Sequence, residues 1–114
     1  MQRDDSYLVD ILTAIRRIET FIHNVDFNQF LENPEKCWAV VSQIAIIGEA
    51  ANHLTGKFKH SHPEIPWQEI TGMRNRVIHG YDQINWQLVW ETIQRDFPPL
   101  KKFIEQRNIG KSES

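Results

Sequence analysis

Residues 7–23 read YLVDILTAIRRIETFIH and carry apolar side chains at successive spacings of 3, 4, 3 and 4. These side chains are Leu8, Ile11, Ile15, Ile18 and Ile22. That repeat places them along one face of an α-helix. The acidic and hydroxyl residues at 4–6 can cap its start, and we expect the helix to end near Asn24, before the polar stretch at 26–29.

The same repeat predicts a second helix. Asn33 and Pro34 form a cap followed by a proline at the first helical position. The apolar positions that follow are Val40, Ile44, Ile47, Ala51 and Leu54. Gly56 predicts the C-terminal stop, and residues 57–66, which contain two prolines, are expected to form a loop.

The C-terminal half predicts further helices. One opens at Pro66-Trp67 and ends at Gly80, and Asn85 caps the next. Their inward positions are Ile70, Met73, Val77, Val89, Ile93 and Phe97. Pro98 and Pro99 must kink or restart the helix, which leaves a last helix with Leu100, Phe103 and Ile104 on its apolar side. The predicted fold is all-α, an antiparallel up-and-down four-helix bundle with a short fifth helix over residues 1–109, and a flexible tail at 110–114.

Length and composition limit the function. A chain of 114 residues with 40% hydrophobic and 25% charged residues is one globular domain. Its net charge of −2 means that nucleic-acid binding requires a local basic patch. Cys37 is the single cysteine, which excludes an internal disulfide and a cysteine-based zinc cluster. With no secretory or membrane-spanning pattern, a cytoplasmic protein that does not contact the membrane is expected.

The side chains suited to chemistry concentrate at residues 73–82, MRNRVIHGYD. On a continuous helix Asn75 and His79 share a face, Arg76 borders it, and Arg74 diverges from His79 by roughly 140°. Two copies related by a two-fold axis could bring Arg74 of one chain to His79 of the other. A homodimer with a shared site is therefore expected.

These residue types suit cleavage of RNA, whose 2′-hydroxyl supplies the nucleophile. In this hypothesis His79 assists proton transfer, Arg74 stabilises charge on the phosphorane, and Asn75 orients the phosphate or the imidazole. No metal or other cofactor is required. The alternative is a solvated basic helix end in which His79 caps the last carbonyl groups.

The spacing Arg74-Asn75-x-x-x-His79-x-Tyr81 resembles the R-x4-H-x-Y signature of HepT-type toxins of the HEPN superfamily. Flanking segments such as Ile47-Gly48-Glu49-Ala50 extend the resemblance over nearly the whole chain. It implies a homodimeric, all-helical ribonuclease toxin of a type VII-like toxin-antitoxin system, acting on RNA and in some members on tRNA. It also implies a cognate MNT-type nucleotidyltransferase antitoxin that transfers AMP to the motif tyrosine, here Tyr81.

Such a modification is physically reasonable. An adenylated Tyr81 would carry a negatively charged phosphodiester two residues from His79, where substrate phosphate is expected. Packing of the Tyr81 ring against the turn is compatible with this role. Tyr7, the other tyrosine, is expected to be a packing residue.

Weaker signals leave alternatives open. Arg76, Lys57 and Lys59 are candidate RNA contacts, or part of a solvated surface. The histidines at 60 and 62 could join His79 as metal ligands, but too few other ligand types lie nearby, and no metal is expected. Glu49 is expected to form an i, i+4 pair with His53 on the surface, and the family resemblance leaves open a supporting role beside the cleft.

The four tryptophans exceed what one small core usually holds, so some are expected at an interface. Two other interpretations compete with the ribonuclease hypothesis. One is a non-catalytic HEPN module that binds nucleotide or a nucleotidyltransferase partner, and the other is a plain dimeric helical adaptor. The intact set of Arg74, His79 and Tyr81 favours the ribonuclease, because an adaptor has no need of all three.

Overall fold

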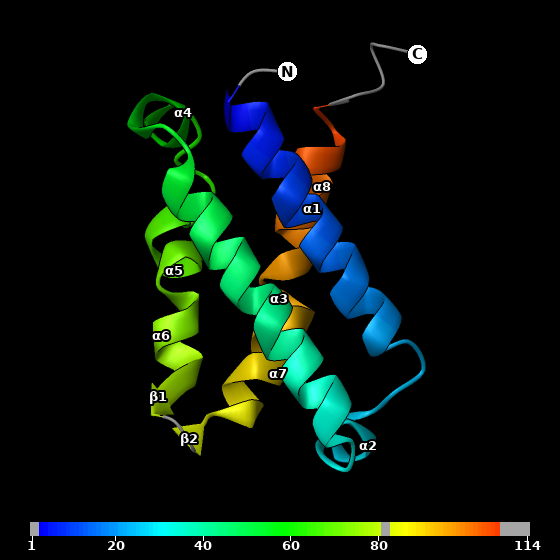
Figure 1. The fold of residues 1–114 in the computed structure, drawn as a ribbon. Helices are drawn as coiled ribbons and strands as arrows, with labels where there is room; N and C mark the ends of the chain where they lie inside the picture. The colour runs from blue at the N-terminus through cyan, green and yellow to red at the C-terminus, as the bar shows by residue number, and fades with distance from the viewer. Residues whose placement is uncertain (1–2, 81–82, 108–114) are drawn as a thin grey trace.

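The computed structural model describes residues 3–80 and 83–107, and these are mostly helical (Figure 1). The all-α class is therefore confirmed. In chain order the elements are α1 Arg3–Phe21, α2 Phe27–Leu31, α3 Pro34–His53, α4 Gly56–Ser61, α5 Trp67–Thr71, α6 Met73–Val77, β1 Ile78–Gly80, β2 Gln83–Ile84, α7 Trp86–Arg95 and α8 Phe97–Glu105. The described residues form more helices than the expected four plus one, because α2 and α4 are additional and the predicted third helix is divided into α5 and α6.

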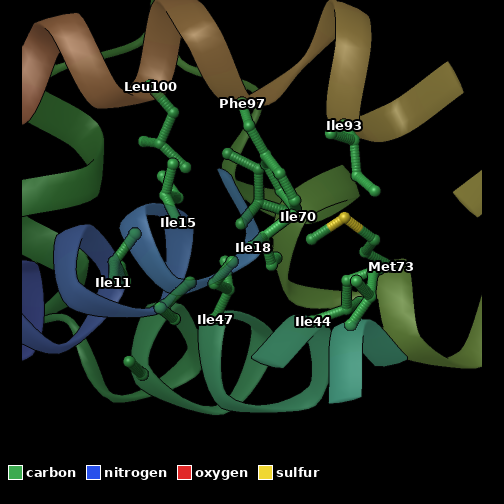
Figure 2. Close-up of a cluster of buried hydrophobic side chains, with 14 of the residues drawn as sticks. Ile11, Ile15, Ile18, Ile44, Ile47, Ile70, Met73, Ile93, Phe97 and Leu100 are labelled. Atoms are coloured by element: carbon green, nitrogen blue, oxygen red, sulfur yellow. The ribbon is translucent and has the colours of Figure 1, made fainter. Parts of the chain in front are cut away.

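The two longest helices, α1 and α3, run antiparallel and pack side by side, with α5 and α6 on one flank of α3 and α7 and α8 behind (Figure 1). One core joins them. Figure 2 shows apolar side chains of α1 and α3 meeting those of the later helices. The predicted inward residues of the first two helices are buried, except Ile22, which is half-buried beyond the end of α1. No helix within the described residues has the length and apolar character needed to cross a membrane.

Helix α1 ends earlier than predicted, and α2 was not predicted. Asn24 has a φ of 58°, in the left-handed region that ends a helix. The polar stretch that follows forms a capping box. Gln29 N donates to Asp26 Oδ1 at 2.8 Å and Asp26 N donates to Gln29 Oε1 at 2.9 Å. With Phe30 fully buried, this short helix is tied to the core.

Helix α3 begins as predicted, with the Asn33 side chain accepting a hydrogen bond from Lys36 N at 3.1 Å. The predicted stop at Gly56 is wrong, and the loop predicted at 57–66 is confirmed only for residues 62–66. The helix ends at His53, and Gly56 opens α4, which Thr55 caps by accepting from Phe58 N at 3.1 Å. Burial of the Phe58 side chain stabilises the new helix.

The predicted third helix is broken. Gly72 ends α5 and begins α6 with φ −86° and ψ 0°, a bridge conformation that interrupts the helix. Helix α6 ends at Val77, and the chain continues into β1, which pairs antiparallel with β2. The prediction that Gly80 is a helix cap is therefore wrong, because Gly80 lies in β1.

The C-terminal helices follow the prediction more closely. Asn85 caps α7 by accepting from Leu88 N at 3.0 Å. A new helix, α8, begins at Phe97. Pro98 and Pro99 lie in its first turn, where the missing N–H groups remove no hydrogen bond of the helix. Residues 110–114, the expected tail, lie outside the described part of the chain.

Candidate functional site

A close contact between α3 and α5 builds the site. A Cβ added to Gly48 would lie 3.3 Å from the carbonyl oxygen of Thr71 and 3.5 Å from that of Ile70. Only glycine permits this approach without displacement of the neighbouring backbone. The contact places the residues that follow Gly48 on α3 opposite those that follow Thr71 on α6.

Between these helices lies an open pocket of about 300 Å³, which we call the Arg74 pocket. Its α3 wall is Ala45, Gly48, Glu49 and Asn52, and its opposite wall is Thr71, Arg74 and Asn75. The structure thus brings together two of the predicted catalytic residues, Arg74 and Asn75, on one wall. Asn52 and Thr71 were not predicted. The helical spacing of Asn52 from Glu49 was a signal for the former, whereas Thr71 depends on a contact between distant segments.

Arg74 and Asn75 are both exposed and orient each other. Arg74 Nη1 donates to Asn75 Oδ1 at 3.3 Å. Arg74 forms no ion pair within residues 3–80 and 83–107. A guanidinium without a carboxylate partner is available for a phosphate, which it can bind through two parallel hydrogen bonds.

Glu49 on the α3 wall is paired, as predicted. Its Oε1 lies 3.0 Å from His53 Nε2. The His53 ring stacks on Tyr7 with a centroid separation of 5.1 Å, and Arg3 Nη2 donates to the His53 carbonyl at 3.0 Å. Tyr7 is half-buried and therefore a packing residue, as expected.

The other motif residues are placed differently from the prediction. The expectation that Asn75 and His79 share a helix face is wrong, because α6 ends at Val77 and the backbone of His79 lies in β1. The angle of roughly 140° between Arg74 and His79 assumed a continuous helix and no longer applies. Tyr81 lies outside the described residues.

The candidate RNA contacts separate into two groups. Arg76 Nη2 donates to the carbonyl oxygen of Glu69 at 2.8 Å, so this guanidinium already has a structural partner. Lys57 and Lys59 lie on α4 rather than on a loop. Lys57 is exposed, whereas Lys59 is half-buried and lines a second hollow next to the Arg74 pocket.

Some histidines and tryptophans outside the motif are packing residues. The His62 ring lies between Phe58 and Phe103, with centroid distances of 4.7 and 5.0 Å. Within the described residues there is no group of three or more potential metal ligands. Trp67 is buried, whereas Trp38 is 54% exposed and packs edge-on against Trp86 at 6.2 Å, so it is the most exposed tryptophan.

The fold and the site together define a predominantly helical domain with a polar pocket lined by an arginine and an amide. Comparison with known proteins identifies its family. The family model Ribonuclease HepT-like matches residues 11–107. The chain therefore belongs to the HepT-like ribonuclease family, and it is an enzyme of the ribonuclease class.

Individual relatives cover nearly all of the chain. It is 40% identical to a probable ribonuclease HepT of Thermococcus cleftensis over 88% of this chain and 91% of the relative. It is 35% identical to a putative RNase of Methanocaldococcus jannaschii, over 88% and 92% of the two chains. A putative RNase of Caldanaerobacter subterraneus is 34% identical over 93% and 95%. No solved structure gives a significant match.

Proposed function

We propose that this ribonuclease is a metal-independent endoribonuclease that cleaves RNA at the Arg74 pocket. The observation that carries the proposal is the arrangement of Arg74 and Asn75. Both line one wall of an open pocket, the amide orients the guanidinium, and no ion pair within the described residues occupies it. The guanidinium is therefore free to bind a substrate phosphate.

The reaction needs one nucleophile, one route for the proton and one charge stabiliser. The 2′-hydroxyl oxygen of RNA attacks the adjacent phosphorus, and the bond from phosphorus to the 5′-oxygen breaks. His79 takes the 2′ proton while water protonates the leaving 5′-oxygen, or His79 protonates the leaving 5′-oxygen while water takes the 2′ proton. Arg74 stabilises the charge on the phosphorane. The products are a 2′,3′-cyclic phosphate and a 5′-hydroxyl. A tRNA is one candidate substrate.

We further propose that the enzyme acts as a homodimer with a site shared between the chains. Because α6 ends before His79, this proposal rests on the family resemblance rather than on helix geometry. The exposed side chains of Trp38 and Ile46 on α3, on the same helix as one wall of the pocket, are suited to a contact between copies.

Control is proposed to come from an MNT-type nucleotidyltransferase antitoxin, as part of a type VII-like toxin-antitoxin system. Transfer of AMP to Tyr81 would add a negatively charged phosphodiester two residues from His79 in the sequence. That group would compete with substrate phosphate for Arg74. The proposal rests on the motif Arg74-x4-His79-x-Tyr81.

Cleavage of RNA in excess EDTA tests the proposed chemistry. Purified full-length protein is incubated with total RNA, and the ends of the products are analysed. Cyclic-phosphate ends formed without a divalent ion are expected. A strict need for a divalent ion, or products with 3′-hydroxyl ends, would contradict the mechanism. Failure to cut any RNA while still binding nucleotide would support the non-catalytic module.

A further inference from the structure

A second hollow of about 610 Å³ lies next to the Arg74 pocket, on the α4 side. The two hollows share Asn52 and Thr71 in their walls. We call the two adjacent hollows together the α3–α5 groove. The second hollow is also lined by Lys59 and His60 of α4 and by Gln68 of α5.

Four polar side chains that line the second hollow have no side-chain partner within the described residues. Within the described residues, no side-chain hydrogen bond or ion pair engages Asn52, Lys59, His60 or Gln68. By contrast, Lys101 Nζ lies 3.0 Å from Glu19 Oε1. The groove thus presents two amides and a cation with no internal partner to a ligand.

The charges along the groove match a polyanion. Arg74 lines the first hollow and Lys59 the second, and the amide of Asn52 borders both. The one carboxylate among the residues that line the two hollows is Glu49, and its side chain is paired with His53. Phosphates spaced along a strand would meet a cation in each hollow, and the amides could bond to base edges or sugars between them.

The dimensions favour a single strand. Both hollows lie within the range of about 300–1,000 Å³ that accommodates a small ligand, here one nucleotide each. Ala45 and Asn52 of the α3 wall are seven residues apart, which is about 10 Å of helix.

From this juxtaposition we infer that the α3–α5 groove binds the RNA strand flanking the cleaved bond, with Lys59 on a phosphate and Asn52 and Gln68 on the intervening nucleotides. The inference rests on the proposed function, because it takes the Arg74 pocket as the place of cleavage. The inference also assigns different roles to two lysines of α4. Lys59 contacts RNA and Lys57 does not.

Binding to a labelled single-stranded RNA of about 12 nucleotides tests the groove, since strands of this length fill a binding groove of one small domain. The His79→Ala protein is used so that the probe is not cut. Lys59→Gln in this background should weaken binding roughly threefold to tenfold, and should reduce the slope of log K against log salt by about 0.7. Lys57→Gln should change neither the affinity nor the salt slope. Lys59→Arg should keep both at their values in the His79→Ala protein.

Equal effects of Lys59→Gln and Lys57→Gln on binding, or no effect of either, would overturn the inference that the groove binds RNA. Cleavage by the unsubstituted protein is measured in parallel. If the unsubstituted protein cuts RNA and Lys59→Gln leaves binding unchanged, the inference that the groove binds RNA is wrong and the proposed function stands. If it cuts no RNA at all, the proposed function fails, and the binding data still decide the groove. With active enzyme, Lys59→Gln should raise KM for long RNA and leave KM for a dinucleotide unchanged.

Discussion

Gly48 of α3 faces the carbonyl oxygen of Thr71, and a methyl group at Gly48 would lie only 3.3 Å from it. This contact holds the two walls of the Arg74 pocket at their separation. Any side chain at position 48 pushes against backbone rather than against a side chain that can rotate away. Gly48, which carries no functional group, therefore sets the separation of the two walls of the Arg74 pocket.

The first prediction follows from that contact. Gly48→Val should lower the free energy of unfolding by about 1–3 kcal/mol, because it overpacks a close contact. Gly56→Val is the matched control, since a Cβ at Gly56 meets nothing within 4 Å. It should change stability by less than about 0.5 kcal/mol. Urea unfolding followed by circular dichroism measures both, and equal losses would show that the Thr71 contact does not constrain α3.

A second prediction concerns the tie between the start of α1 and the start of α4. Asp4 accepts from Thr55 N through Oδ1 and from Thr55 Oγ1 through Oδ2, both at 2.8 Å. Asp4→Ala should therefore lower the free energy of unfolding by about 1–3 kcal/mol, because two charge-assisted bonds to a part-buried residue are lost. Asp10→Ala, on the exposed face of the same helix, is the control and should have little effect.

The long helices could be predicted because their signals are local. The apolar repeat of α1 and the caps at Asn33 and Asn85 each involve residues within one turn of each other. The capping box of α2 was also local, and Asp26 followed three residues later by Gln29 was a readable signal. Helix α4 depends on Phe58 reaching a distant aromatic cluster, which includes Trp67 at 5.8 Å. Periodicity alone cannot reveal such a contact.

The site was predictable on one wall only. Arg74 and Asn75 are neighbours in the sequence, and their chemistry was visible there. The opposite wall depends on the contact of Gly48 with a carbonyl 23 positions away, which no short motif encodes. The break at Gly72 was hidden because apolar residues continue at helical spacing on both sides of it, at Ile70 and Met73.

A third prediction concerns control by modification. Incubation with the cognate nucleotidyltransferase and ATP should raise the mass by one or more AMP units, mapped to Tyr81 and not to Tyr7. Cleavage should fall in proportion, because the added phosphate competes with substrate for Arg74. Tyr81→Phe removes the acceptor oxygen and should escape this inactivation. If the partner silences Tyr81→Phe fully without ATP, control works by binding alone.

A fourth prediction tests whether the site is shared between two chains. Arg74→Ala and His79→Ala proteins, each expected to be nearly inactive, are mixed, partially unfolded and refolded together. With a shared site, one of the two sites in each mixed dimer keeps both residues, so about a quarter of the original activity should return. No recovery would place Arg74 and His79 of one site in a single chain.

The central claim is cleavage by Arg74 and His79, and the most direct test compares rates on one RNA substrate in EDTA. Arg74→Ala and His79→Ala should each lower the rate by about 10²- to 10⁴-fold, since a charge stabiliser or a proton-transfer group is lost. Arg17→Ala, an exposed arginine of α1, is the control and should cut at the original rate. Undiminished cleavage by His79→Ala or Arg74→Ala, in proteins with unchanged circular dichroism, would contradict the account.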